Sequence, residues 1–170
     1  MTPAQLAAAI PILKPLIEAE PSLAQAVLTG QDNIIAAWLN VTAAPDFFVT
    51  KTSLSRHDIL TATSGEGTTF AWAGGAYITR AQGERDAFRE MFNSTGTVNP
   101  TLASITAAFA DIFSGAGGAG NRTHIAAISK RKATRAEKAL ATTPGTGLLA
   151  SPATLTFDGS VSTEEAGMLR

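Results

Sequence analysis

Residues 99–140 read NPTLASITAAFADIFSGAGGAGNRTHIAAISKRKATRAEKAL, and their pattern sets the expected fold class. Asn99-Pro100-Thr101 supplies the cap residue and the proline that begin a helix. Apolar side chains then recur with the period of one helix face, at Leu102, Ile105, Phe109, Ile112 and Phe113. The glycine-rich residues 114–120 are expected to form a flexible loop, and Asn121 to cap the helix that follows.

Residues 1–44 show the same helical pattern in shorter pieces. Thr2-Pro3 begins the first helix, whose apolar face contains Leu6, Ile10, Leu13 and Ile17. Pro11 and Pro15 are expected to kink or split this helix, because each removes a backbone donor. A second helix is expected from Pro21-Ser22 to Gly30. A third helix over residues 32–39 is expected to bury Ile34, Ile35, Trp38 and Leu39.

β structure is expected only in short segments. Residues 47–52 are β-branched and aromatic, which favours a strand. Residues 68–78 alternate around Gly74-Gly75 and predict a small β-hairpin, because glycine allows the positive φ values of a tight turn. Ser55 is expected to cap a short helix before this hairpin. Thr79 is expected to cap a stronger helix after it, with an apolar stripe of Phe88, Met91 and Phe92.

The C-terminal residues change character after residue 142. Residues 142–147 have the composition of a linker, residues 153–157 alternate like a strand, and residues 162–165 begin a helical turn. This tail has too little apolar surface to fold alone, so it should dock on its own body or on a neighbour. The sequence predicts a mainly α protein: a bundle of about six or seven helices in residues 1–142, with the small β-hairpin, and an extended C-terminal arm in residues 143–170.

The composition makes many kinds of catalysis improbable. The chain has no cysteine and two histidines, which excludes disulfides, thiolate nucleophiles and a three-histidine metal centre. Its 32 Ala and 22 Thr favour close-packed helices with a weakly charged exterior. The stretch at residues 6–16 lacks the features of a signal peptide, and no apolar run is long enough to cross a membrane. We expect no enzyme activity, no cofactor, no metal and no membrane partner.

Two motifs have a functional and a plain interpretation. Residues 115–120 match GxGxxG, and Glu137 follows at the distance of a ribose-binding acid. A helical pattern rather than a buried strand precedes the glycines, so a plain flexible loop is favoured over a nucleotide site. His57-Asp58 places a base beside an acid, but neighbours on a helix point in different directions. Surface or cap positions are therefore expected for His57 and His124.

Residues 122–140 form a basic segment, with six Lys and Arg against Glu137 in a chain of net charge −1. Three interpretations remain open: a solvated helix face, contact with phosphates, and contact with an acidic protein surface. The C-terminal tail is acidic and could lie on this segment of a neighbouring subunit in a ring. The expected interface residues are Arg122, Lys130, Arg131, Lys132, Arg135, Lys138, Phe157, Asp158, Glu164 and Glu165.

Several segments together resemble small virion proteins of tailed double-stranded DNA bacteriophages, of the head–tail connector (adaptor or neck) type. The resemblance covers most of the chain as a likeness of segments and contains no catalytic signature. The segments are Thr2-Pro3-Ala4-Gln5-Leu6, residues 44–52, Thr79-Arg80-Ala81-Gln82-Gly83-Glu84-Arg85, residues 109–115, Thr134-Arg135-Ala136-Glu137-Lys138 and residues 151–157.

This resemblance implies a ring-forming adaptor that contacts the portal protein on one side and a tail or neck protein on the other. The ring would contain about twelve copies. If its basic segment faced the lumen, it would also meet the backbone of the genomic DNA. Such a protein assembles in the host bacterial cytoplasm and ends in the virion. The alternatives are a tail terminator or stopper, a minor capsid or tail protein, and, remotely, a nucleotide-binding enzyme.

Overall fold

The computed structural model describes residues 1–142 and 145–170 of the chain. Nine α-helices lie in this described part, more than the six or seven expected, and each sheet there has two strands. The mainly α fold class expected from the helical periodicity is confirmed, with small β elements beside the helices.

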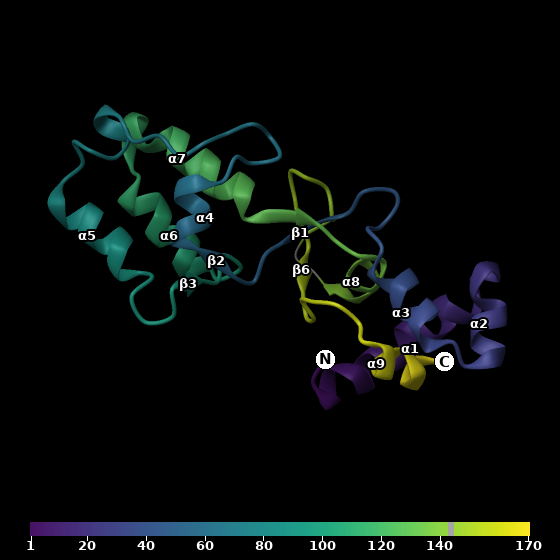
Figure 1. The fold of residues 1–170 in the computed structure, drawn as a ribbon. Helices are drawn as coiled ribbons and strands as arrows, with labels where there is room; N and C mark the ends of the chain where they lie inside the picture. Colours follow the sequence, from purple (N-terminus) through teal and green to yellow (C-terminus); the bar gives the residue numbers. More distant parts are fainter. Residues whose placement is uncertain (143–144) are drawn as a thin grey trace. The chain divides into compact units, whose positions relative to one another are not determined.

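The chain forms two compact units (Figure 1). Unit 1 contains Met1–Val49 and Lys132–Arg170, and unit 2 contains Thr50–Arg131. Residues 145–170 therefore fold with the N-terminal helices. The predicted boundary between a body ending at residue 142 and an arm beginning at residue 143 falls on residues outside the described part.

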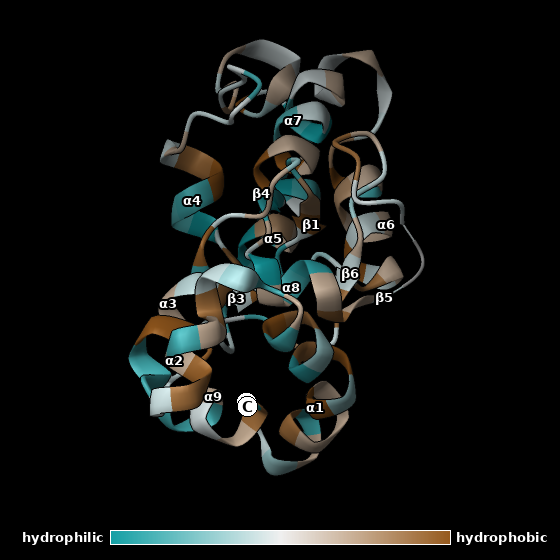
Figure 2. Cartoon of the chain, turned by 90° about the vertical axis from the view of Figure 1, so that its right-hand side faces the viewer, coloured by the Kyte–Doolittle hydropathy of each residue, from teal (hydrophilic) through white to brown (hydrophobic). Residues whose placement is uncertain are grey.

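Unit 1 is a group of helices around a mainly aliphatic core. Its helical elements are α1 (Pro3–Glu18), the 3-10 turn η1 (Pro21–Leu23), α2 (Ala24–Thr29), α3 (Asp32–Asn40), α8 (Arg135–Leu140) and α9 (Thr163–Leu169). Their apolar stretches are visible along the ribbon in Figure 2. Helix α9 packs against α1 and α3 and contributes the fully buried Ala166 and Leu169. The C-terminal tail thus docks on its own unit.

The sequence predicts that proline kinks or splits helix α1. The helix is continuous, so the predicted split is wrong, and the kink stays a prediction. Pro11 and Pro15 are both exposed, while Leu13 and Ile17 on the opposite face are fully buried. The carbonyls that lose their helical donors therefore face water, which satisfies them. Burial of the apolar face then outweighs the two missing hydrogen bonds.

Helix α3 differs from its prediction at two positions, because Trp38 is only partly buried and Ile34 is exposed. Ile35 and Leu39 are fully buried as expected, but Ile34 is 43% exposed. Ala36 lies in the core instead. Ile35, Ala36 and Leu39 follow the helical period and share a buried cluster with residues of α9, which packs against α3. Ile34 lies outside this helix face.

Three small sheets complete the described chain. Strand β1 (Phe48–Thr50) pairs with β4 (Lys130–Lys132), and β2 (Leu54–Ser55) pairs with β3 (Thr97–Val98). In unit 1, β5 (Ala141–Thr142) is antiparallel to β6 (Thr154–Leu155). A small cluster of buried side chains supports this region of unit 1: Val49, Ala133, Ala153 and Leu155.

Unit 2 is built around aromatic rings. Its helices are α4 (Arg56–Thr61), the 3-10 turn η2 (Gly74–Ala76), α5 (Gln82–Glu90), α6 (Ala103–Ile112) and α7 (Gly115–Ile128). The ring of Phe88 is fully buried and lies 5.4 Å from Phe113 and 5.5 Å from Phe92, centroid to centroid. Phe70, Tyr77 and Phe109 extend the same cluster.

The predicted hairpin at residues 68–78 is absent, because this segment contains only the turn η2 and no strand. Its backbone groups bond to a side chain of α7 instead of to a partner strand. The helix predicted from Thr79 begins later, at Gln82, with Ala81 as its N-cap residue. Buried rings at Phe70 and Tyr77 therefore determine this segment's path more strongly than strand propensity.

Candidate functional site

Residues 62–81 of unit 2 form a long loop whose only helical turn is η2. The loop joins α4 to α5 (Figure 1). Irregular segments longer than about 12–15 residues are uncommon inside a compact unit and usually carry function. The 62–81 loop is therefore a candidate binding surface.

Asn121 of α7 holds the middle of the loop. Its side-chain oxygen accepts a hydrogen bond from the Ala71 N–H at 2.7 Å, and its nitrogen donates to the carbonyls of Ala71 at 3.0 Å and Ala76 at 3.1 Å. Asn121 is fully buried. A buried amide is costly unless it is hydrogen-bonded, and here both ends of the amide are used on the loop backbone.

His124 of α7 holds the beginning of the loop. Its Nε2 lies 2.9 Å from the carbonyl oxygen of Ile59, and its Nδ1 lies 3.1 Å from the hydroxyl of Thr68. A carbonyl can only accept, so Nε2 carries the hydrogen of this pair. The ring is fully buried. The expected surface position of His124 is wrong, and this histidine is a structural link between α4, α7 and the loop.

The glycine-rich segment is helical, so the predicted flexible loop at residues 114–120 and the capping role of Asn121 are both wrong. Helix α7 begins at Gly115, two residues after Phe113. A Cβ atom at Gly117 would lie 2.9 Å from the carbonyl oxygen of Gly75, so glycine allows the loop to approach the helix. Gly117, Asn121 and His124 are spaced along one helix face.

The same geometry argues against a dinucleotide site at residues 115–120. That motif needs a buried strand whose turn presents glycine backbone to a pyrophosphate. Here α6 precedes the glycines, and the helix face that contains Gly117 is occupied by the loop. Glu137 does not serve as a ribose-binding acid in this structure. It is buried in unit 1, accepts hydrogen bonds from the N–H groups of Thr134 and Gly159, and completes the cap of α8.

The loop exposes two large apolar side chains. Trp72 is 46% exposed and Ile78 is 58% exposed. The Trp72 ring packs edge-on against Phe70 at 5.0 Å and against Tyr77 at 5.4 Å, and both of these supports are buried. Tryptophan held in this way is typical of residues that dominate protein–protein contacts, since little side-chain entropy is lost on binding.

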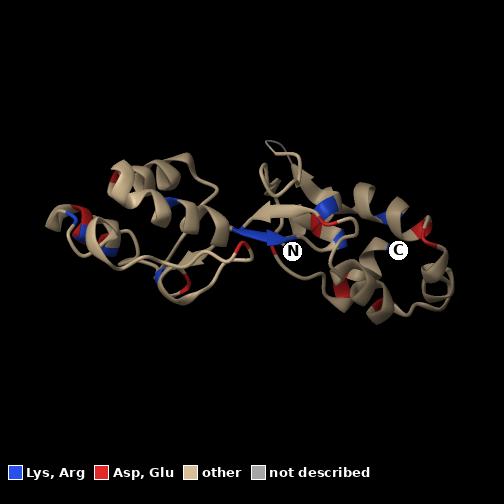
Figure 3. Ribbon diagram, turned by 90° about the horizontal axis from the view of Figure 1, so that it is seen from above, with Lys and Arg blue, Asp and Glu red and all other residues tan. Residues whose placement is uncertain are grey.

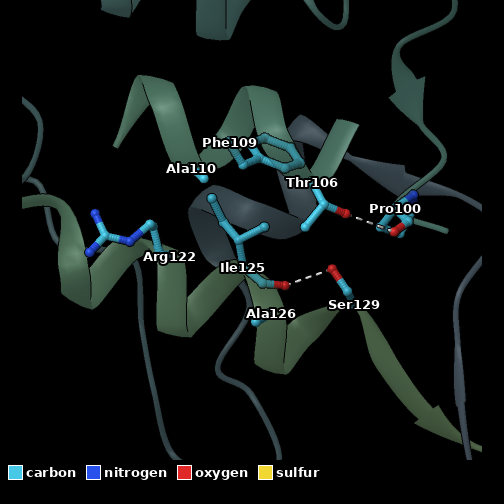
Figure 4. Close-up of a pocket in the computed structure, with 8 residues that line it drawn as sticks. All are labelled: Pro100, Thr106, Phe109, Ala110, Arg122, Ile125, Ala126 and Ser129. Atoms are coloured by element: carbon cyan, nitrogen blue, oxygen red, sulfur yellow. Dashed lines mark hydrogen bonds between the residues drawn. The ribbon is translucent and has the colours of Figure 1, made fainter. Parts of the chain in front are cut away.

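A cavity of about 290 Å³ lies on another side of α7, between α7 and α6 (Figure 4). Its walls are mainly apolar, and Arg122 lies at one end. The Arg122 guanidinium donates to the carbonyls of Phe113 and Gly115, the second at 3.0 Å. The lining residues are Pro100, Thr106, Phe109, Ala110, Arg122, Ile125, Ala126 and Ser129.

The predicted basic interface residues lie on three separate elements. Arg122 belongs to α7; Lys130, Arg131 and Lys132 form β4, which is blue in Figure 3; Arg135 and Lys138 belong to α8. Lys130 pairs with Glu66 at 3.5 Å, and Lys132 pairs with Asp46 at 2.7 Å. The Arg135 guanidinium lies 4.5 Å from the centre of the Trp38 ring. Three of these cations therefore have an acidic or aromatic partner within their own unit.

The four interface residues predicted in the C-terminal tail have different environments. Phe157 is buried in the core of unit 1. Glu165 accepts hydrogen bonds from the Ser162 and Met1 nitrogens and so caps α9 from within the unit. Asp158 and Glu164 are exposed. Of the two acidic residues on α9, Glu164 is the one directed to solvent.

His57 and Asp58 have separate environments. His57 is exposed on α4. Ser55 caps this helix, as the sequence suggested, and Asp58 completes a capping box with it. The hydrogen bond from the Ser55 hydroxyl, 2.7 Å from the carboxylate, holds the pKa of Asp58 below its ordinary value. Because this carboxylate accepts the hydrogen bonds of the helix cap, it does not favour a catalytic pairing with His57.

In residues 1–142 and 145–170, no three His, Asp or Glu side chains gather in a way that could hold a metal ion. None of the helices in this described part is long and apolar enough to span a membrane. A scan against protein-family models and searches of curated proteins and of solved structures find no match.

Proposed function

We propose that this chain is a structural subunit of a tailed-bacteriophage virion, of the head–tail connector type, which forms a ring between the portal and the tail. The observation that supports a docking role is the 62–81 loop, in which buried polar anchors hold an exposed tryptophan in a fixed position. The resemblance of its sequence segments to small phage virion proteins suggests the particle in which this docking occurs.

The placement of the polar side chains favours docking over catalysis. The two buried polar groups of α7, Asn121 and His124, are both bonded to backbone or side chains around the loop. Catalytic groups must instead reach a substrate from a cavity. Exposed Trp72 and Ile78 have the chemistry of a contact surface, since apolar and aromatic anchors provide most of the free energy of protein association.

Two related roles remain as second candidates, a tail terminator or stopper and a minor capsid or tail protein. All of them use docking surfaces of this kind, so the loop does not separate them. The order of the ring does: about twelve copies fit an adaptor below the portal, and about six fit a stopper or tail component. The same ring could bring Lys and Arg side chains near the backbone of the exiting DNA.

The test is the mass and symmetry of the purified protein, alone and mixed with purified portal rings, by light scattering and electron microscopy. We expect a ring on the portal. Trp72→Ala should weaken portal or tail binding at least tenfold, because about 1.4 kcal/mol of lost contact energy has that effect. Leu102→Ala is the matched control, since Leu102 is a 50% exposed apolar residue elsewhere in unit 2. A monomer in both settings would contradict the proposal.

A further inference from the structure

We propose that the cavity between α6 and α7 binds helix α9 of a second copy of this chain, with Met168 in the cavity and Glu164 paired with Arg122. The inference rests on the proposed ring and names the contact that would build it. Unit 2 of one copy would hold unit 1 of the next, which is the head-to-tail arrangement that closes a ring when rotation permits.

The cavity has the chemistry for one apolar side chain beside a carboxylate. Phe109, Ile125 and Ala126 supply apolar walls, and Arg122 supplies a cation at one end (Figure 4). The two carbonyls that hold Arg122 engage its Nη1. Its Nε and Nη2 are directed to neither of them and can meet an incoming carboxylate, which an Arg guanidinium binds with two parallel hydrogen bonds.

Helix α9 presents the matching pair. Glu164 and Met168 are four residues apart, so their side chains are neighbours on one helix face. Both are exposed, and Met168 is 52% exposed. Glu165 does not compete for this role, because it caps its own helix. Methionine is unbranched and flexible, so it fills an irregular apolar cavity readily.

The charges of the two units support the pairing. Unit 1 has five Lys and Arg against eight Asp and Glu, a net charge of −3, and unit 2 has eight against six, a net charge of +2. Unlike net charges favour contact between unit 1 of one copy and unit 2 of another over contact between two like units. Glu164 and Arg122 place one charge of each sign at the centre of this contact.

A mixed disulfide tests the contact directly, because the chain has no cysteine of its own. Ala126→Cys in one protein and Met168→Cys in a second are mixed under mild oxidation. We expect a disulfide-linked dimer of the two proteins at several times the yield of the control mixture. The control replaces Met168→Cys by Leu28→Cys, since Leu28 is an 81% exposed apolar residue of the same unit.

Charge reversal tests the ion pair in the same assay. Arg122→Glu in the Ala126→Cys protein should reduce the yield to the control level, and Glu164→Lys in the Met168→Cys protein should restore it. Glu18→Lys, another exposed acid of unit 1, should not restore it. Thermal unfolding of each variant shows whether it is folded. A yield equal to the control for the unreversed pair, or no restoration, would overturn the inference.

The two proposals fail separately. If the crosslink equals its control while the wild-type protein still forms rings on the portal, the connector role stands and the ring uses another contact. If the crosslink forms while no ring or portal binding is seen, the self-contact stands and the connector role is wrong.

Discussion

The two units bury different kinds of side chain. Unit 1 closes its core mainly with aliphatic residues on short helices, among them the fully buried Leu13, Ile17 and Leu39. Unit 2 closes its core with a cluster of aromatic rings around Phe88, two of which, Phe70 and Tyr77, come from a long loop. A helix can supply its apolar face from local sequence alone, but a loop must have its backbone polar groups satisfied from elsewhere.

The two units also differ in what their buried polar residues do. In unit 2, Asn121 and His124 provide hydrogen bonds to the 62–81 loop from positions 45 or more residues away in the sequence. In unit 1, the buried Glu137 serves a helix cap and one turn. Unit 1 also has long-range polar contacts: the Asn40 amide bonds the N–H and the carbonyl of Val161, each at 2.8 Å. Unit 2 differs in using such contacts to hold a long loop that carries part of its aromatic core.

The largest expected effect comes from Phe88→Ala, which would empty the centre of the aromatic cluster. We expect a loss of about 3–5 kcal/mol in the free energy of unfolding of unit 2. Each unit contains one of the chain's two tryptophans, Trp38 and Trp72, so urea unfolding of the Trp38→Phe and Trp72→Phe backgrounds follows each unit separately.

The matched change in unit 1 is Leu13→Ala, with an expected loss of about 2–5 kcal/mol. It should shift the transition reported by Trp38 and leave that of Trp72 nearly unchanged, and Phe88→Ala should do the reverse. Equal shifts of both reporters in both variants would mean that the units unfold as one, and the contrast between their cores would then have no consequence for stability.

The next effect separates polar anchoring from apolar packing. Asn121→Ala leaves the N–H of Ala71 and the carbonyl of Ala76 without their partner, and each lost hydrogen bond at these part-buried positions costs about 0.5–1.5 kcal/mol. We expect faster hydrogen exchange at Ala71 and a red shift of Trp72 fluorescence.

The control for this change is Asn33→Ala, which removes an exposed asparagine from α3 of unit 1. It should alter neither signal. Unchanged exchange at Ala71 in Asn121→Ala would show that the rings of Phe70 and Tyr77 hold the loop without help, and the docking role of a fixed Trp72 would lose its main support.

The sequence predicted the parts of this fold that depend on local pattern. The helix that stops at Gly30 lies where its residues indicated, as do the helix capped by Ser55 and the helix that begins after Ser162. These signals act within one helical turn. Thr2 likewise forms the cap expected for the first helix.

The predictions that were wrong concern segments whose structure depends on residues far away in the sequence. Residues 68–78 alternate as a strand does, but the backbone groups of Ala71 and Ala76 bond to the distant side chain of Asn121 instead of to a partner strand. Of the candidate docking surfaces, the sequence indicated Arg122 and Glu164 but neither Trp72 nor its anchors. One signal was available: Asn121 and His124 are three residues apart, so a helix through them places both side chains on one face.

The smallest effect separates two glycines of the same helix. Glycine in a helix interior costs about 1 kcal/mol relative to alanine, so a glycine is retained at a cost unless its lack of a side chain is used. At Gly117 an added Cβ would meet the carbonyl oxygen of Gly75 at 2.9 Å, and at Gly120 it would meet nothing within 4 Å. Gly120→Ala should therefore raise the free energy of unfolding of unit 2 by up to about 1 kcal/mol. Gly117→Ala should lower it, because the loop backbone must move away.

The signs of these two changes decide why the glycine-rich segment exists. Opposite signs in urea unfolding, with a changed Trp72 fluorescence only for Gly117→Ala, would show that one glycine is there to admit the 62–81 loop. Two stabilising changes would mean that the loop yields easily to a methyl group. The close contact of Gly75 with α7 would then play no part in holding Trp72 in place, and unit 2 would differ from unit 1 in its aromatic core alone.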